Sequence, residues 1–433
     1  MDIIDIIEKK RDGKVLSKEE IEYFVNEYVA DKIPDYQISS LLMAIYFKGL
    51  NDEELTNLTM AMVNSGDRID LSGIEGVKVD KHSTGGVGDK TTLIIAPIVA
   101  ACGGKIAKMS GRGLGFTGGT ADKLESIQNY RIDIGMDDLI KQVNEIGVGL
   151  IYQSGNLTPA DKKIYALRDV TGTVESIPLI ASSIMSKKIA SGSDCLVLDV
   201  KMGKGAFMKN IEDARELSKR MIEIGNGVGL KTVALITNMD IPLGREIGNS
   251  LEVKEAIEIL KGNGPEDLKE ICIELAKYMV HLSLNISIDK AEKKVRESIS
   301  NGSAFEKFKE LVRWQGGNED WINYPENFPN CIYNEKVRAF RSGYIKSMDT
   351  EAIGKVSLKL GSGREYKDEP IDYQAGITVL KKTGDYVEIG DVVAVLHTNR
   401  EEVLQNMTES YLNSIELSNE PVEKPKLIYE VLN

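Results

Sequence analysis

The chain has 433 residues and a formal net charge of −13, from 67 acidic and 54 basic side chains. This length exceeds what a single hydrophobic core usually serves, so two or three domains are expected. The negative charge disfavours a nucleic-acid partner, because binding to phosphate backbones needs a dominant basic face.

The sequence also gives no sign of a membrane or export segment. Residues 1–5 lack the basic region and the long apolar run of a signal peptide, and no stretch has the apolar length that a membrane span requires. The cysteines are scattered without metal-ligand spacing, which favours buried free thiols: Cys102, Cys195, Cys272 and Cys331. We therefore expect a reduced, cytoplasmic protein with no membrane partner.

Residues 1–65 have the pattern of short amphipathic helices. Ser17 with Glu20, and Asn51 with Glu54, have the spacing of capping boxes, and apolar residues follow each pair at helical intervals. Residues 159–188 are also rich in helix-forming patterns. We predict a small helical domain made of residues 1–65 together with about 160–192.

From residue 77 the pattern changes to strands that run into glycine loops. Residues 77–79 form the first predicted strand, followed by a glycine loop at 83–88 and a helix from about 90 to 101. A second strand at 105–109 enters a second glycine loop at 110–120. Such strand–loop–helix units are typical of an α/β domain with a mostly parallel sheet.

The remaining chain extends this α/β domain and then changes character. Further strands are predicted at 195–200 and 233–237, with a helix around 213–224 between them. The pattern from 331 onward is β-rich. The predicted fold is thus α/β plus all-α: the helical domain, a larger α/β domain of residues 75–155 and about 195–330, and a β-rich C-terminal subdomain of residues 331–433.

The two glycine loops carry the residue types that suit a phosphate ion. Glycines allow backbone N–H groups to approach an anion, and a following helix contributes its positive end. Hydroxyl and cationic side chains accompany both loops: Lys81, His82, Ser83, Thr92, Ser110, Arg112 and Thr120. Serines and threonines beside glycines often only cap turns, but their concentration in two neighbouring units favours an anion site.

Two segments partly match familiar nucleotide-binding motifs, but each departs from its motif. Residues 113–118 match the glycine spacing of a dinucleotide-binding loop, but the loop begins earlier and is crowded with Ser110 and Arg112, which disfavours a dehydrogenase. Residues 88–91 are similar to the end of a Walker A loop, but Asp89 stands where that motif requires glycine.

Residues 110–125, SGRGLGFTGGTADKLE, resemble the signature of the thymidine and pyrimidine-nucleoside phosphorylase family. Residues 81–90, KHSTGGVGDK, resemble the phosphate loop of that family, and residues 165–188 resemble its base-binding segment. The resemblance extends over essentially the whole chain. Anthranilate phosphoribosyltransferases share the architecture and a similar glycine loop, but not the motif at 110–125.

This resemblance implies phosphorolysis of pyrimidine nucleosides (uridine, thymidine and deoxyuridine) by inorganic phosphate, giving free base and a (deoxy)ribose-1-phosphate. The phosphate would be bound by Lys81, Ser83, Thr92, Lys108, Ser110 and Thr120. The nucleoside would be bound by Arg168, Ser183, Lys187, Leu114, Tyr165, Val174, Ile180 and Phe207, although the apolar members of this set also suit a plain core. His82, Arg168 and Lys187 would be the catalytic residues; a structural role for His82, holding the loop in place, is the alternative.

Two points on substrate choice and rival functions stay open. Lys108, rather than methionine, is typical of family members that accept both uridine and thymidine, so we expect the broad activity; a thymidine-restricted phosphorylase is the alternative. A magnesium-dependent phosphoribosyltransferase and a silent nucleoside-binding protein are the more distant alternatives.

The resemblance also implies a cation and a partner. The broader members bind a monovalent cation, so potassium is expected at Gly88, Lys90, Leu243 and Glu246 through backbone oxygens and at Glu255 through its carboxylate, although Lys90 and Glu246 bring charged side chains to this place. Phosphate acts as a co-substrate and no organic cofactor is expected. A two-fold homodimer through the N-terminal helices is the expected assembly.

Overall fold

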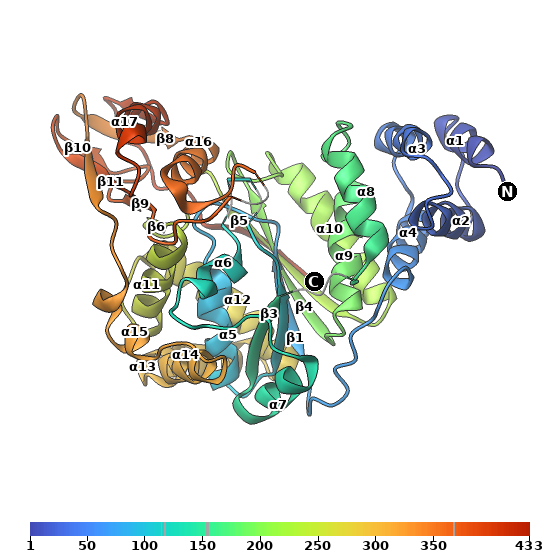
Figure 1. The fold of residues 1–433 in the computed structure, drawn as a ribbon, viewed down its shortest axis with the longest axis horizontal. Coiled ribbons are helices and arrows are strands. Elements are labelled where there is room, and N and C mark those ends of the chain that lie inside the picture. The colour runs from blue at the N-terminus through green and yellow to red at the C-terminus, as the bar shows by residue number, and fades with distance from the viewer. Residues whose placement is uncertain (114, 117, 153–155, 367–368) are drawn as a thin grey trace.

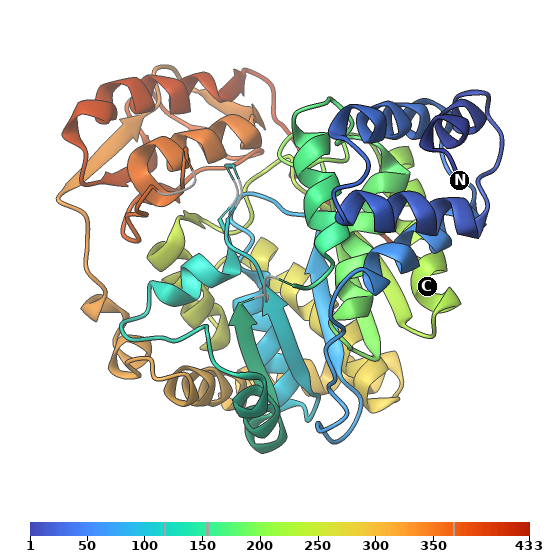
Figure 2. The same cartoon turned by 45° about the vertical axis from the view of Figure 1, so that its right-hand side comes forward.

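The computed structural model describes residues 1–113, 115–116, 118–152, 156–366 and 369–433. Three parts lie side by side (Figures 1 and 2): the N-terminal helices in blue, a central sheet with its helices, and a C-terminal part in orange and red. The predicted combination of a helical part, an α/β part with a mostly parallel sheet and a β-rich C-terminal part is confirmed.

The helical part is built from four N-terminal helices and two later ones. Both predicted capping boxes are present, at Ser17 with Glu20 and at Asn51 with Glu54, and each starts a helix. Helices α8 and α9 pack against α2 and α4 in one apolar core. The bounds of these helices are α1 Ile3–Arg11, α2 Lys18–Val29, α3 Asp35–Lys48, α4 Asp52–Asn64, α8 Pro159–Asp169 and α9 Ile177–Ala190.

A buried ion pair joins the first and last of the four N-terminal helices. The Lys10 ammonium donates to Glu54 Oε1 at 2.7 Å, and both side chains are at most 3% exposed. Glu54 also accepts from the backbone N–H groups of Leu16 and Asn51, at 2.8 and 2.9 Å. One carboxylate therefore caps α4, fixes the preceding turn and neutralises a buried lysine.

The central sheet has the order β1-β4-β5-β13. Strands β1 (Val79–Ser83), β4 (Cys195–Met202) and β5 (Lys231–Asn238) are parallel, and β13 (Ile428–Leu432) runs antiparallel along β5. Assigning all of residues 331–433 to the C-terminal subdomain was therefore wrong for 428–432, which return to the central sheet. A single edge strand of this kind has no local sequence signal, because its pairing partner lies almost 200 positions earlier in the chain.

Strands β2 (Ile106–Ser110) and β3 (Val148–Tyr152) form a parallel pair beside β1, joined to it by a bridge between Lys78 and Lys105. The first strand begins at Val79, two residues later than predicted, and extends through Lys81 and His82. Successive side chains of a strand point to opposite faces, so Asp80 and His82 face one side of the sheet and Lys81 faces the other.

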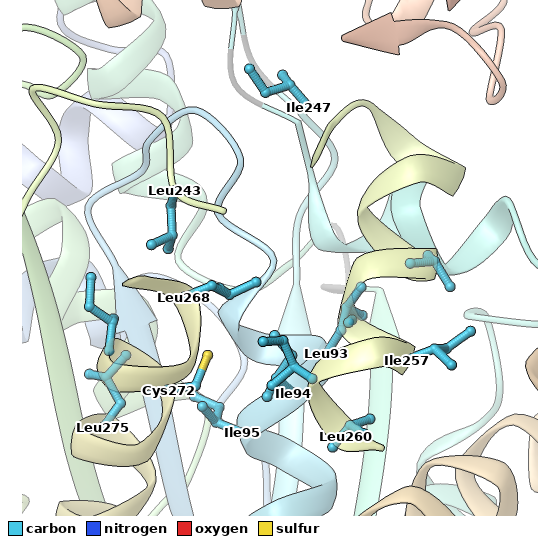
Figure 3. Close-up of a cluster of buried hydrophobic side chains, with 14 of the residues drawn as sticks. Leu93, Ile94, Ile95, Leu243, Ile247, Ile257, Leu260, Leu268, Cys272 and Leu275 are labelled. Atoms are coloured by element: carbon cyan, nitrogen blue, oxygen red, sulfur yellow. The ribbon is translucent and has the colours of Figure 1, made fainter. Parts of the chain in front are cut away.

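Helices cover both faces of the sheet, and β4 is buried along its whole length. On one face, Leu196, Leu198 and Val200 pack against the helical part and α10; on the other, Cys195 and Val197 pack against α5 and α12. Figure 3 shows the second core, where side chains of α5, α11 and α12 meet. The helices of the α/β part are α5 Thr91–Ala101, α6 Thr120–Glu125, α7 Met136–Ile146, α10 Ile211–Gly227, α11 Asn249–Leu260, α12 Glu266–Leu284, α13 Ile288–Ser300 and α14 Ser303–Trp314.

Among the described residues, no single helix is long and apolar enough to cross a bilayer. Helices α12 and α13 have the required length and apolar composition only when they are counted together, and they are bent by 119° relative to each other.

Among the described residues, the C-terminal part consists of two small antiparallel sheets with helices α16 and α17, and the short helix α15 precedes it. One sheet has the order β6-β9-β11-β7, and its edge strand β6 belongs to the segment before α11, so this sheet joins the C-terminal part to the central one. The elements are β6 Glu246–Ile247, α15 Asp320–Asn323, β7 Tyr333–Arg338, β8 Gly343–Met348, α16 Thr350–Ser357, β9 Gly376–Val379, β10 Tyr386–Val387, β11 Val392–Thr398, α17 Leu404–Asn413 and β12 Ile415–Ser418.

The Glu54→Ala substitution is expected to lower the free energy of unfolding of the helical part by about 3–5 kcal/mol, because it leaves the Lys10 ammonium buried without its partner. The measurement is urea unfolding followed by circular dichroism. Glu53→Ala, on the exposed side of the same helix turn, is the control and is expected to change stability by less than about 0.5 kcal/mol. Equal effects of the two substitutions would contradict the assignment of Glu54 as a buried partner.

Candidate functional site

Two adjoining cavities lie at the carboxyl ends of β1, β2 and β3, and the carboxyl ends of parallel strands are where open sheets bind their ligands. The smaller cavity follows the two glycine loops, and the larger one extends under α8 and α9. Both are lined by the same five residues where they meet: His82, Ser83, Gly111, Arg112 and Lys187. The two cavities therefore adjoin, so that ligands bound in them would be neighbours.

The smaller cavity, of about 290 Å³, is lined mainly by glycines and by hydroxyl and charged side chains, and is called the polar cavity below. Its lining includes every residue that the sequence predicted to bind phosphate: Lys81, Ser83, Thr92, Lys108, Ser110 and Thr120. Lys187 and Lys188 approach from α9, on the opposite side. The structure thus brings the whole predicted set together around one space that is large enough for a small anion.

The Asp80 carboxylate positions two lysines at the wall of the polar cavity. Lys108 Nζ lies 3.1 Å from Asp80 Oδ1, and Lys188 Nζ lies 2.8 Å from Asp80 Oδ2. Although burial opposes ionisation, these two ammonium groups hold the pKa of Asp80 well below its usual value. Burial, with the nearby lysines, lowers the pKa of Lys108 to about 8. The Lys108 ammonium also donates to the backbone carbonyl of Lys81.

Lys81 is held on the other face of β1. Its ammonium donates to Thr91 Oγ1 at 2.6 Å and lies 3.4 Å from Asp199 Oδ2. Asp89 is close by, at 3.8 Å, and against the effect of burial the lysines around it keep its pKa well below the usual value. Asp199, outside the polar cavity, and Asp89, which lines it, therefore hold the Lys81 ammonium at the cavity wall.

The second glycine loop folds back on itself beside the polar cavity. A Cβ at Gly119 would overlap the backbone of Arg112 and Gly113, so only glycine fits there. The backbone N–H of Gly113 donates to Asp122 Oδ2 at 2.7 Å, which fixes the turn. Among the described residues, the buried Ser110 hydroxyl has no hydrogen-bond partner. A buried polar atom of this kind is usually satisfied by a ligand or a water molecule.

The larger cavity, of about 550 Å³, is mostly apolar and is called the base cavity below. Its lining includes these residues of the predicted nucleoside set: Tyr165, Arg168, Val174, Ile180, Ser183, Lys187 and Phe207. The remaining prediction, Leu114, lies outside the described residues. Apolar walls with a few convergent polar groups are typical of small-molecule sites.

Arg168 lies at the floor of the base cavity and is almost fully buried. Its guanidinium donates to the carbonyls of Thr173, Val174 and Leu179, at 3.2, 2.7 and 3.0 Å. Burial lowers its pKa to about 10, so it remains charged at neutral pH. Part of its role is thus structural, because it shapes the segment that carries Val174; its further N–H donors are available to a ligand.

Lys187 stands where the two cavities meet. Its ammonium donates to Asp161 Oδ2 at 2.7 Å and to Ser183 Oγ at 3.2 Å, which leaves a third N–H donor. Asp161 comes from α8 and the two other residues from α9. Two helices therefore fix the direction of one ammonium group.

His82 lines both cavities from the end of β1. Burial, together with the ammonium groups of Lys188, Lys108 and Lys187, lowers its pKa well below the usual value. A neutral imidazole can donate a hydrogen bond from one ring nitrogen, but it is not charged at neutral pH. The structure therefore favours a hydrogen-bonding role over transfer of a proton from a charged histidine.

The residues predicted to bind potassium do not fit that ion. The Lys90 ammonium lies within hydrogen-bond distance of the Leu243 and Glu246 carbonyls, at 3.0 and 2.7 Å, and of Glu255 Oε2, at 2.5 Å. The backbone N–H of Lys90 donates to the carbonyl of Gly88 at 2.9 Å. The oxygens expected around potassium are thus bound to Lys90, and the prediction of a potassium ion at these residues is corrected.

Sequence reasoning missed three residues that hold the site together. Asp80 and Lys188 flank recognised motifs, yet only the fold shows that they meet across 108 positions of the chain. Asp161, the partner of Lys187, likewise lies 26 positions from it. Only Lys188 gave a signal, as a charge at the end of the largely apolar segment 177–190, because such a charge needs a partner when buried; the segments of Asp80 and Asp161 hold several charges each.

Comparisons with known proteins agree with this geometry. The family model described as the a/b domain of a glycosyl transferase family matches residues 75–305, and that of the helical bundle domain matches residues 4–66. The model of a pyrimidine nucleoside phosphorylase C-terminal domain matches residues 344–418. A crystal structure of anthranilate phosphoribosyltransferase from Thermus thermophilus has the same fold, with a TM-score of 0.58 and 18% identity over 73% of this chain and 99% of that one.

The chain therefore belongs to this glycosyltransferase family. Its curated relatives include pyrimidine-nucleoside phosphorylases from Staphylococcus haemolyticus, 55% identical, and from Staphylococcus epidermidis and Staphylococcus aureus, each 54% identical. Each of these alignments covers 100% of both chains.

His82 is expected to remain neutral when the pH falls through 6.5. Its folded-state pKa is depressed, so its contribution to stability is complete above the unfolded value of about 6.5 and is lost as the pH falls below it. The measurement is a histidine-selective NMR titration of the three histidines, with the His82→Gln variant to assign the signal. Protonation of His82 with a midpoint at or above pH 6.5 would contradict the assignment.

Proposed function

We propose that this protein is a pyrimidine-nucleoside phosphorylase, which splits a pyrimidine nucleoside with inorganic phosphate into free base and a (deoxy)ribose-1-phosphate. The observation that carries the proposal is the junction of an anion-sized polar cavity with a mostly apolar cavity at His82, Ser83 and Lys187. The names of the full-length relatives support the same reaction.

In the proposed reaction, an oxygen of the phosphate bonds to the anomeric carbon of the sugar as the bond from that carbon to the base nitrogen breaks. The electron pair of the broken bond leaves with the base, and the base takes up the proton that hydrogen phosphate releases as the ester forms, giving the free pyrimidine. No nucleophile from the protein is needed. The polar cavity supports the phosphate with N–H groups of Lys81 and Lys108 and with the hydroxyl of Ser110.

The base side would stabilise the negative charge that develops on the leaving pyrimidine. The remaining donor of Lys187 and a ring N–H of His82 lie where the cavities meet, and Arg168 lines the base cavity beside them. Hydrogen bonds to the ring edge strengthen as charge moves onto the base, so they favour the transition state over the bound substrate. A neutral His82 suits this role, because it donates without adding a further buried charge.

The range of substrates is proposed to include ribo- and deoxyribonucleosides. Lys108 lines the polar cavity and its ammonium is fixed by Asp80, so it is in place to contact a phosphate or the sugar hydroxyls next to it. This position makes a 2′-hydroxyl tolerable. A thymidine-restricted enzyme is the alternative.

The direct test measures base released from uridine, deoxyuridine and thymidine, with and without inorganic phosphate. Release from all three, only with phosphate and without magnesium, is the expected result. Release from deoxynucleosides alone would contradict the role of Lys108. A requirement for magnesium and a pyrophosphorylated sugar would favour a phosphoribosyltransferase, and ligand-induced stabilisation without product would favour a silent binding protein.

The Ser110→Ala variant is expected to raise the KM for phosphate about 10- to 100-fold while the KM for uridine changes little, because one hydrogen bond to a charged ligand is lost.

Lys187→Met is expected to lower kcat about 100-fold or more, since it removes a donor to the developing negative charge. Steady-state kinetics with both substrates varied separates the two effects. A Ser110→Ala variant with an unchanged KM for phosphate would contradict the placement of phosphate in the polar cavity.

A two-fold homodimer through the N-terminal helices is also proposed. Helices α1 and α3 flank a surface groove of about 920 Å³ lined by Ile7, Met43 and Phe47, and Phe47 is 74% exposed. Exposed apolar surface of this kind marks interaction sites. Light scattering after gel filtration is expected to give twice the 47.8 kDa of one chain.

In the same measurement, Phe47→Asp is expected to give monomers. Phe340→Asp, which alters an exposed aromatic residue of the C-terminal part, is the matched control and is expected to leave the dimer intact. A dimer that survives Phe47→Asp and dissociates with Phe340→Asp would contradict the proposed face.

A further inference from the structure

Lys90 lies two positions after the first glycine loop and directly before the first residue of α5. Its side chain is fully buried, although lysine is rarely buried unless it is paired. The ammonium contacts Leu243, Glu246 and Glu255, none of which lines the polar cavity. The side chain is therefore not a phosphate ligand, and its burial needs another explanation.

The surroundings of the ammonium are those of a bound cation. Its three acceptors, two carbonyls and one carboxylate oxygen, lie at 3.0, 2.7 and 2.5 Å and match the three N–H donors of a lysine. A Cβ at Gly244 would come within 2.9 Å of Lys90 Nζ and overlap Glu255, so this turn is closed tightly around the charge.

The Glu255 carboxylate completes the arrangement. Besides Lys90, it accepts from the backbone N–H of Arg245 at 2.8 Å and of Glu246 at 3.2 Å. Its side chain is 5% exposed, and the neighbouring Leu243 and Ile247 belong to the apolar core shown in Figure 3. A carboxylate in such a place needs a cation beside it, because a buried unpaired charge is strongly destabilising.

We propose that the Lys90 ammonium is a built-in monovalent cation, which takes the place of a potassium ion at Leu243, Glu246 and Glu255 and makes the protein independent of potassium. This inference deepens the proposed function, since the cation would hold the phosphate loop. A second cation among the same oxygens would be repelled by the ammonium and would have to displace its hydrogen bonds.

The Lys90 ammonium links the phosphate loop to two other parts of the molecule, α11 and β6. Lys90 follows the loop, Glu255 belongs to α11, and Glu246 is a residue of β6, which pairs with β9 of the C-terminal part. The Glu246 side chain also accepts from Thr378 Oγ1 at 2.8 Å. A cation that is covalently attached cannot dissociate, so these parts stay joined whatever the salt composition.

The charges around Lys90 favour the charged form of its ammonium group. Burial acts to lower its pKa, but the carboxylates of Glu255 and Glu252 outweigh burial and raise the pKa above its usual value. The ammonium is thus charged throughout the neutral pH range. Burial raises the pKa of the adjacent Glu246 to about 7, so that side chain is only partly ionised at neutral pH.

The first test uses the unmodified protein. Its thermal unfolding midpoint and its KM for phosphate are measured in potassium chloride and in tetramethylammonium chloride at equal ionic strength. Both quantities are expected to be the same in the two salts. A higher midpoint or a lower KM in potassium would overturn the proposal, and the unfolding readout holds even if the protein does not catalyse phosphorolysis.

The second test removes the attached cation. Lys90→Ala is expected to lower the unfolding midpoint by roughly 5 °C in tetramethylammonium, because the Glu255 carboxylate loses its partner. Potassium or ammonium, but not tetramethylammonium, is expected to restore much of this loss by binding among the freed oxygens. No loss, or a loss that potassium leaves unchanged, would overturn the proposal.

Lys10→Ala is the matched control. Lys10 is equally buried and paired with Glu54, but no backbone carbonyl of the described residues accepts from its ammonium. This variant is expected to be destabilised and not to recover in potassium. Recovery of both variants to the same extent would show a general salt effect and overturn the proposal. If Lys90→Ala does not fold, the salt comparison on the unmodified protein decides alone.

Discussion

The pairing of Asp80 with two lysines is the interaction on which the rest of the site depends. Asp80 belongs to β1, Lys108 to β2 and Lys188 to α9, so one carboxylate joins both strand–loop units to the helical part. Lys187, which precedes Lys188 in α9, lines both the base cavity and the polar cavity. The Asp80–Lys188 pair therefore ties the helix that carries Lys187 to the strand that carries His82.

Pairing with carboxylates explains how several lysine ammonium groups can line a buried cavity. Each ammonium at the polar cavity is paired with a carboxylate outside it, as Lys81 is with Asp199 and Lys187 with Asp161. Such pairs limit the cost of burial while leaving N–H donors directed at the cavity. An incoming anion then meets donors that are already oriented, which is the property that favours catalysis over simple attraction.

Local patterns in the sequence predicted the parts of the fold that depend on neighbouring residues. Ser17 and Asn51 start helices, and the glycine loops follow strands, because caps and turns are decided within a few positions. The pairing of 428–432 with β5, and the meeting of Asp80 with Lys188, depend on contacts made only after collapse. Lys90 shows the same limit: its charge was visible in the sequence, but not that its ammonium would lie on the oxygens of Leu243 and Glu246.

The proposed reaction requires phosphate and base to occupy the two adjoining cavities at the same time. A crystal structure of the protein with inorganic phosphate and uracil tests this directly. The account predicts phosphate within hydrogen-bond distance of Ser110 and Lys108, and the uracil ring edge within reach of Lys187 and Arg168. Phosphate bound outside the polar cavity, or uracil bound away from α8 and α9, would contradict it.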